Sequence, residues 1–128
     1  MEHEEYMRQA LELARLAMAE GEVPVGCVIV RDGAVVGRGR NRRETAQTAL
    51  GHAELEAIAQ ACRTLGGWRL AGCALYVTLE PCPMCAGAIV NARIPAVYYG
   101  AKDDKAGCCG SVLNLFEERF NHLSLIHI

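Results

Sequence analysis

The apolar residues of the first twenty positions recur at the spacing of an amphipathic helix. Over residues 4–20 they are three or four positions apart, and Gly21 ends the pattern. An apolar run over residues 23–30 then predicts a strand. Asp32 and Gly33 form a two-residue turn signal, so residues 34–37 should return as the antiparallel partner of that strand.

Helical and strand patterns alternate along the rest of the chain. The predicted segments are a polar loop over 42–51, a helix over 52–65, a strand over 74–79, a helix over 82–93, a strand over 96–100 and a short edge strand within the apolar tail 122–128. A helix connects the strands 74–79 and 96–100, so these two should pair in parallel. The pattern therefore predicts an α/β domain with a central mixed sheet and helices on both faces.

Length and composition are those of one globular domain. The chain has 128 residues, of which 52% are apolar, and this is enough for a core without disulfides. No apolar run is long enough to span a membrane. Residues 1–5 are acidic and lack the basic-then-apolar layout of a signal peptide, so we expect a cytoplasmic protein without a membrane partner.

Seven cysteines, an odd number without an export signal, argue against a disulfide framework. Reduced thiols either pack in a core or bind metal. Cys27, Cys62 and Cys73 stand singly among apolar residues, and we expect them in the core. Cys82 and Cys85 are spaced so that both sulfurs lie on one face of a helix, where they can reach a common point.

The net charge of −2 argues against a general polyanion binder with a field of one sign. One local basic cluster stands out within six residues: Arg38, Arg40, Arg42 and Arg43. From composition alone this cluster is either a solvated strand end or a phosphate-binding patch.

Two predicted helix starts carry the candidate chemistry. His52 and Glu54 open one helix, and Cys82 and Cys85 open the other. Imidazole nitrogen and thiolate sulfur are zinc ligands, and three protein ligands with one open position form a catalytic site. The metal would lower the pKa of a water in that position, and Glu54 would carry its proton to the substrate.

The cysteine pair is also compatible with roles that involve no catalytic metal. The Cys-x-x-Cys spacing could belong to a redox pair or to half of a structural zinc site. Cys108 or Cys109, in a glycine-rich loop, could close the site as a fourth ligand, but Glu54 would then have no role.

The combination of His-x-Glu with Pro-Cys-x-x-Cys is the signature of the zinc-dependent cytidine/deoxycytidylate deaminase superfamily. Within it, the chain resembles the bacterial tRNA-specific adenosine deaminases. The resembling segments are residues 22–26, 51–54, 75–88, 99–103 and 117–122. The resemblance implies a three-layer α-β-α cytidine-deaminase-like fold. It also implies that a zinc-bound hydroxide converts adenosine to inosine at the wobble position of tRNA.

The resemblance further implies roles that the residues alone do not indicate. Asn41 should contact the flipped nucleotide, the backbone at Ala53 should hold the base edge, and Asp103 should lie beside the flanking nucleotides. The protein should be a homodimer that binds the tRNA anticodon loop, with one Zn²⁺ per chain. The arginine cluster would then contact phosphates.

The resemblance ends at His122, where the family continues into a strand and a long final helix. We therefore expect one deaminase domain over residues 1–128 that lacks this helix, and an apolar tail that adds to the sheet edge. Two other functions remain: a deaminase of free bases or nucleosides of the guanine or cytidine type, and a non-catalytic zinc or RNA-binding module. Free cytidine deaminases usually carry cysteine at the position of His52, which disfavours the cytidine type.

Overall fold

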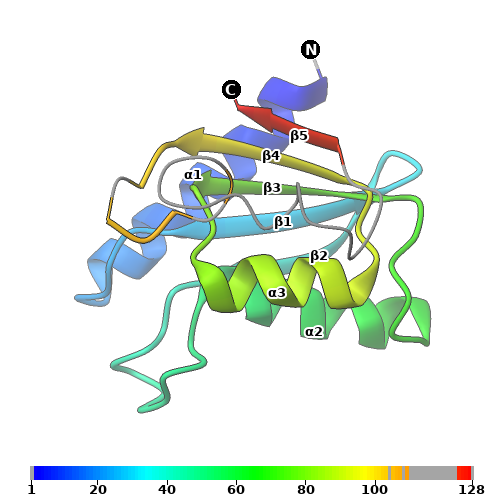
Figure 1. Cartoon of the computed structure of the whole chain (residues 1–128). Coiled ribbons are helices and arrows are strands. Elements are labelled where there is room, and N and C mark those ends of the chain that lie inside the picture. Colours follow the sequence, from blue (N-terminus) through cyan, green and yellow to red (C-terminus); the bar gives the residue numbers. More distant parts are fainter. Residues whose placement is uncertain (1, 104, 108, 110–123, 128) are drawn as a thin grey trace.

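A computed structural model describes residues 2–103, 105–107, 109 and 124–127. Its elements run in the order α1 (Glu2–Ala19), β1 (Gly26–Arg31), β2 (Ala34–Arg40), α2 (Ala53–Leu65), β3 (Cys73–Leu79), α3 (Pro83–Ala92), β4 (Ala96–Ala101) and β5 (Ser124–His127) (Figure 1). The five described strands form one sheet in the order β2-β1-β3-β4-β5. The predicted elements are therefore present.

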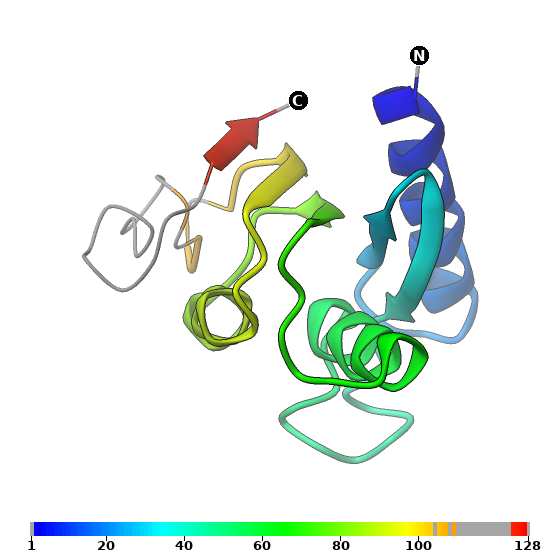
Figure 2. The ribbon, with the colours of Figure 1, turned by 90° about the vertical axis from the view of Figure 1, so that its right-hand side faces the viewer.

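Helices cover both faces of the sheet, as the resemblance implied. Figure 2 shows α1 on one side and α2 with α3 on the other. The first helix packs against β1, β2 and β3, whereas α2 packs against β1 and β2 and also touches α3. The three-layer α-β-α arrangement of the cytidine-deaminase-like fold is confirmed.

The sheet is mixed because some of its strands are connected by a tight turn and others by a helix. Asp32 (φ 52°) and Gly33 (φ 77°) both adopt positive φ, the geometry of a tight hairpin turn, and β1 pairs antiparallel with β2. In contrast, α3 connects β3 to β4, and these strands pair in parallel. Both predicted pairings are confirmed.

The predicted first strand begins too early. Pro24 has no backbone N–H, and the Val25 N–H donates to the Val23 carbonyl (2.8 Å), so this segment turns and β1 starts only at Gly26. The register of the hairpin also shifts between Ile29 and Val30, an irregularity that the apolar pattern gives no sign of.

The apolar tail adds to the sheet edge, as predicted. β5 pairs in parallel with β4, with Val97 opposite Leu125 and Tyr98 opposite Ile126. The resembling segment 117–122 lies outside the described residues. No helix in the described part of the chain combines the length and apolarity needed to cross a bilayer.

The main core lies between the sheet and the helices α2 and α3. Cys27 is fully buried there, Cys73 is buried, and Cys62 packs against this core while partly exposed. Core packing of these cysteines is thus confirmed, although for Cys62 it is incomplete.

Helix α2 lies unusually close to β2 because the strand offers glycine at the contact. A Cβ atom at Gly39 would lie 2.1 Å from the Ala53 carbonyl oxygen. This carbonyl belongs to the first residue of α2, so the contact fixes where the helix starts.

We expect Gly39→Ala to destabilise the fold by about 1–3 kcal/mol, because the methyl group displaces backbone rather than a flexible side chain. Gly87→Ala is the matched control, since a Cβ at this helical position meets no atom within 4 Å. Urea unfolding monitored by circular dichroism measures both. Equal midpoints for the two variants would contradict the role assigned to this contact.

Candidate active site

The helices α2 and α3 begin next to each other. His52 is the N-cap of α2 and Cys82 is the N-cap of α3, both in extended backbone conformation. Neither side chain makes a capping hydrogen bond to its helix. Both therefore face the space in front of the two helix starts.

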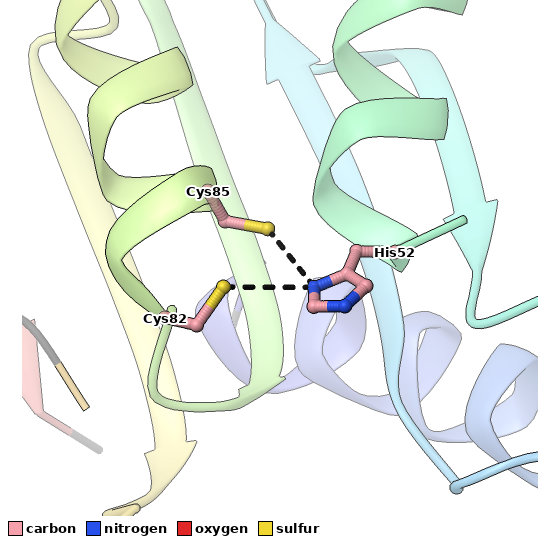
Figure 3. A group of neighbouring side chains, drawn as sticks. All are labelled: His52, Cys82 and Cys85. Atoms are coloured by element: carbon pink, nitrogen blue, oxygen red, sulfur yellow. Dashed lines mark hydrogen bonds between the residues drawn. The ribbon is translucent and has the colours of Figure 1, made fainter. Parts of the chain in front are cut away.

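Three potential metal ligands meet in this space. Figure 3 shows His52 from the start of α2 facing Cys82 and Cys85 of α3. The Nδ1 atom of His52 lies 3.6 Å from Cys82 Sγ and 3.5 Å from Cys85 Sγ. The three ligand atoms lie within 4.8 Å of one another.

These separations fit a tetrahedral zinc site. With a Zn–N bond of about 2.05 Å and a Zn–S bond of about 2.3 Å, tetrahedral geometry separates nitrogen from sulfur by about 3.6 Å. Cys85 is fully buried and His52 is half-buried, so one cation between them would be largely shielded by protein. The residues present therefore fit the metal in chemistry and in spacing.

The surroundings of the two thiols favour ionisation of Cys82 over Cys85. The hydrogen bond from Cys85, followed by smaller effects of backbone amides in the first turn of α3 and of His52, lowers the pKa of Cys82 to about 5. The same hydrogen bond, with burial, raises the pKa of Cys85. Cys82 is therefore the more readily ionised of the two thiols, and a bound cation would favour the thiolate form of both.

Glu54 lies one residue beyond the start of α2 and is 4% exposed. Burial raises the pKa of its carboxyl to about 7, and the nearby charge of Cys82 adds to this effect. The carboxyl can thus both accept and release a proton near neutral pH.

Of these groups, His52, Glu54 and Cys82 border one cleft. Its empty volume is about 530 Å³, including space open to solvent. The predicted site residues that line it are His52, Ala53, Glu54, Cys82, Asn41 and Asp103. Cys85 lies behind the lining, fully buried. The structure therefore brings together the residues that were predicted from separate parts of the sequence.

Asn41 and Asp103 differ in how much of each side chain remains available. Asn41 is 8% exposed, and its Oδ1 accepts a hydrogen bond from the Arg43 N–H (3.1 Å), which leaves its amide NH₂ for a ligand. Asp103 uses Oδ1 to accept hydrogen bonds from the Lys105 N–H (3.0 Å) and the Ala106 N–H (3.2 Å). One carboxylate oxygen of Asp103 is therefore already used in hydrogen bonds within its own turn.

The arginine cluster is mostly paired with carboxylates. Arg40 makes two hydrogen bonds to Glu20, both 2.9 Å long. The other ion pairs are Arg42 with Glu56 (3.7 Å) and Arg43 with Glu44 (3.8 Å). Of the cluster, Arg43 lines the cleft, whereas Arg38 is exposed on β2.

Cys109 is not part of the metal-ligand group. It is buried in the main core, and its backbone N–H donates to a Glu80 carboxylate oxygen (2.8 Å). Among the residues that the structure describes, the group contains His52, Cys82 and Cys85 alone. Cys108 lies outside the described residues.

Sequence reasoning missed two buried carboxylates beside the cleft. Glu80 is 2% exposed and lines it, and Glu22 is 6% exposed and accepts hydrogen bonds from the loop that follows β2. In the sequence, Glu80 only marks the end of a strand and Glu22 only follows a helix. No pattern indicates that either would be buried.

Comparisons with known proteins agree with this geometry. Residues 1–126 match the MafB19-like deaminase family. A tRNA-specific adenosine deaminase of Bacillus subtilis is 53% identical over 118 residues, which cover 91% of this chain and 73% of that protein. This chain belongs to the tRNA-specific adenosine deaminase family.

Two solved structures extend the comparison to the family fold. One, from a study of A-to-I editing by tRNA:A34 deaminases, has a TM-score of 0.94 at 43% identity, with all of both chains covered. The other, a guanine deaminase from Bacillus subtilis, has a TM-score of 0.77 at 45% identity over 80% of this chain and 66% of that one. The family is thus close in fold to an enzyme for a free base, and its members belong to a zinc-dependent superfamily.

The lowered pKa of Cys82 predicts that its thiol is more reactive than a core thiol when no metal is bound. After treatment with a chelator, Cys82 should be alkylated by iodoacetamide near neutral pH well before Cys27, because Cys82 has a lowered pKa and is half-buried. Cys27 is fully buried, which raises its pKa. Peptide mass spectrometry over time measures both, and equal rates would contradict the predicted charge distribution.

Proposed function

We propose that this protein hydrolyses the exocyclic amine of adenosine at the wobble position of tRNA and produces inosine. The observation that carries the proposal is the convergence of His52, Cys82, Cys85 and Glu54 on one cleft, in a chain 53% identical to a tRNA-specific adenosine deaminase. A second relative, the chloroplastic tRNA(adenine(34)) deaminase of Arabidopsis thaliana, is 47% identical over 87% of this chain and 8% of that protein.

We infer that His52 Nδ1 and the sulfurs of Cys82 and Cys85 hold one zinc ion per chain. The spacing of these atoms supports this assignment, and so does the lowered pKa of Cys82, which favours a thiolate ligand. When bound, zinc supplies Lewis-acid activation of water near neutral pH. Three protein ligands leave one position for solvent, which is the arrangement of a catalytic rather than a structural site.

Glu54 is the proton carrier in this proposal. Its carboxylate takes one proton from the attacking water and passes it to a ring nitrogen of the adenine; it then takes the second proton from the hydroxyl group that has added to the ring and passes it to the amine, which leaves as ammonia. The raised pKa of the buried carboxyl, about 7, suits a group that must both take and give a proton. The carboxylate holds no metal in this assignment.

The remaining predicted residues form the binding surface for the base. We infer that Asn41 donates its amide N–H to an acceptor of the flipped base, since its Oδ1 already accepts from Arg43. Ala53 is the first residue of α2, where backbone N–H groups lack partners within the helix and can face a ligand. Asp103 would bound the space beside the flanking nucleotides.

Arg43 is the best candidate of the arginine cluster for a phosphate contact. It lines the cleft, and its ion pair with Glu44 is long and exposed, so exchange for a phosphate would cost little. Arg40 is less suitable because it is held by two hydrogen bonds to Glu20.

Three further expectations stay predictions: a homodimer, a cytoplasmic location, and one deaminase domain over residues 1–128. The resemblance suggests the first.

The roles of Glu54 and the ligands are separable by experiment. Glu54→Ala should lower kcat by on the order of 10²–10⁴ while the protein retains one zinc per chain, because the carboxylate moves protons. Cys85→Ser should lose zinc, and Cys109→Ser should retain it. Elemental analysis and single-turnover assays measure both properties. Loss of zinc in Glu54→Ala would mean that a ligand is misassigned.

The substrate can be tested directly against the main alternative. Incubated with a tRNA anticodon stem-loop, free adenosine, cytidine and guanine, the protein should form inosine in the stem-loop and leave the free compounds largely unchanged. Nucleoside mass spectrometry and ammonia release report the products. Faster turnover of guanine than of the stem-loop would favour the activity named for the guanine deaminase neighbour.

A further inference from the structure

Glu80 is a buried carboxylate for which the proposed chemistry has no use. It follows the end of β3, two positions before Cys82, and is 2% exposed while bordering the cleft. A buried carboxylate is tolerated only where hydrogen bonds replace its water. Its partners therefore indicate what it does.

The partners of Glu80 come from the loop after β4. Its Oε1 accepts a hydrogen bond from the Asp103 N–H (3.1 Å), and its Oε2 accepts one from the Cys109 N–H (2.8 Å). Each oxygen thus holds a backbone amide near a different end of the segment 103–109. Asp103, one of the two residues held, lines the cleft.

The loop is shaped to fit this carboxylate. The Gly107 N–H donates to the Asp103 carbonyl (2.8 Å), which closes the turn. A Cβ at Gly107 would lie 2.4 Å from Glu80 Cδ and 2.6 Å from the Asp103 carbonyl oxygen. Only glycine therefore allows the loop to lie against the carboxylate at this distance.

We propose that Glu80 is a positioning residue: it fixes the cleft wall that carries Asp103, and through that wall it sets how the substrate beside the target base is held. The inference rests on the proposed function, because it assigns Asp103 to the substrate. Glu80 itself touches no reacting atom. Its loss should weaken substrate binding while the metal site and the proton carrier stay in place.

Glu22 provides a comparison residue that holds the loop after β2 instead of the loop after β4. It is 6% exposed, and its carboxylate accepts hydrogen bonds from the Glu44 N–H (3.2 Å) and the Thr45 N–H (2.6 Å). It is therefore also a buried carboxylate that holds two backbone amides of a loop. That loop carries Asn41 and Arg43 but not Asp103, so any effect of Glu22→Gln on substrate binding should be independent of Asp103.

The primary test is Glu80→Gln, assayed on an anticodon stem-loop. The amide keeps the shape of the side chain but places an NH₂ group opposite one of the two backbone N–H donors. We expect KM to rise on the order of tenfold, as for the loss of one hydrogen bond to a charged group, with kcat within about threefold and zinc content unchanged. Hydrogen exchange at the amides of Asp103 and Cys109 should become faster.

A double-mutant cycle decides whether Glu80 acts through Asp103. The effect of Glu80→Gln on KM should largely disappear in an Asp103→Ala background, because both changes release the same wall. In contrast, the factors by which Glu22→Gln and Asp103→Ala each change KM should multiply in the double variant. Gly107→Ala disturbs the same contact from the loop side and should repeat the Glu80→Gln result, which covers the case of a Glu80 variant that fails to fold.

The outcomes separate the two proposals. If the wild-type chain forms no inosine, the proposed function fails and the role of Glu80 fails with it. A second outcome is that the wild type is active while the KM effects of Glu80→Gln and Asp103→Ala multiply in the double variant, as those of Glu22→Gln and Asp103→Ala do. That result overturns only the positioning role. A fall in kcat with unchanged KM would also overturn it.

Discussion

The site depends on two helices that begin beside each other in front of one edge of a mixed sheet. Parallel pairing of β3 with β4 places α3 on the same face as α2, and the close approach of Gly39 to Ala53 fixes where α2 starts. These two constraints hold an imidazole and two thiols at the spacing of ligands around one ion. The backbone thus brings the three ligand atoms to one point.

Ionisable groups gather where the two helices meet. The pKa of Cys82 is lowered, whereas burial, together with the charge of a Cys82 thiolate, raises the pKa of the Glu54 carboxyl and favours its protonated form. A divalent cation at the ligands would oppose this effect. Metal binding and the protonation of Glu54 are thus linked, and the site is arranged for a group that must change its charge during a reaction.

Loops set the walls of the cleft, and buried carboxylates hold these loops. Glu22 holds the backbone after β2, and Glu80 holds the backbone after β4. In both cases a buried carboxylate accepts hydrogen bonds from backbone N–H groups that have no partner within a strand or helix. This gives irregular segments a defined position beside the ligands without regular secondary structure.

The sequence by itself determined the elements and the chemistry. Periodicity located the helices and strands, and Asp32 and Gly33 specified the hairpin. The spacing of His52, Glu54, Cys82 and Cys85 predicted which side chains meet at one site, because each of these signals is local. It placed the start of β1 too early, since the turn at Pro24 depends on one backbone hydrogen bond. Asn41 and Asp103 came only from the resemblance.

Only the tertiary structure decided which distant groups meet. Arg40 is paired with Glu20 and Arg42 with Glu56, which the run of arginines gives no sign of. Glu22 and Glu80 are buried because loops remote in sequence fold over them, and Cys109 joins the core instead of the metal group. Burial and charge pairing are properties of neighbours in space, so a pattern along one segment of chain does not contain them.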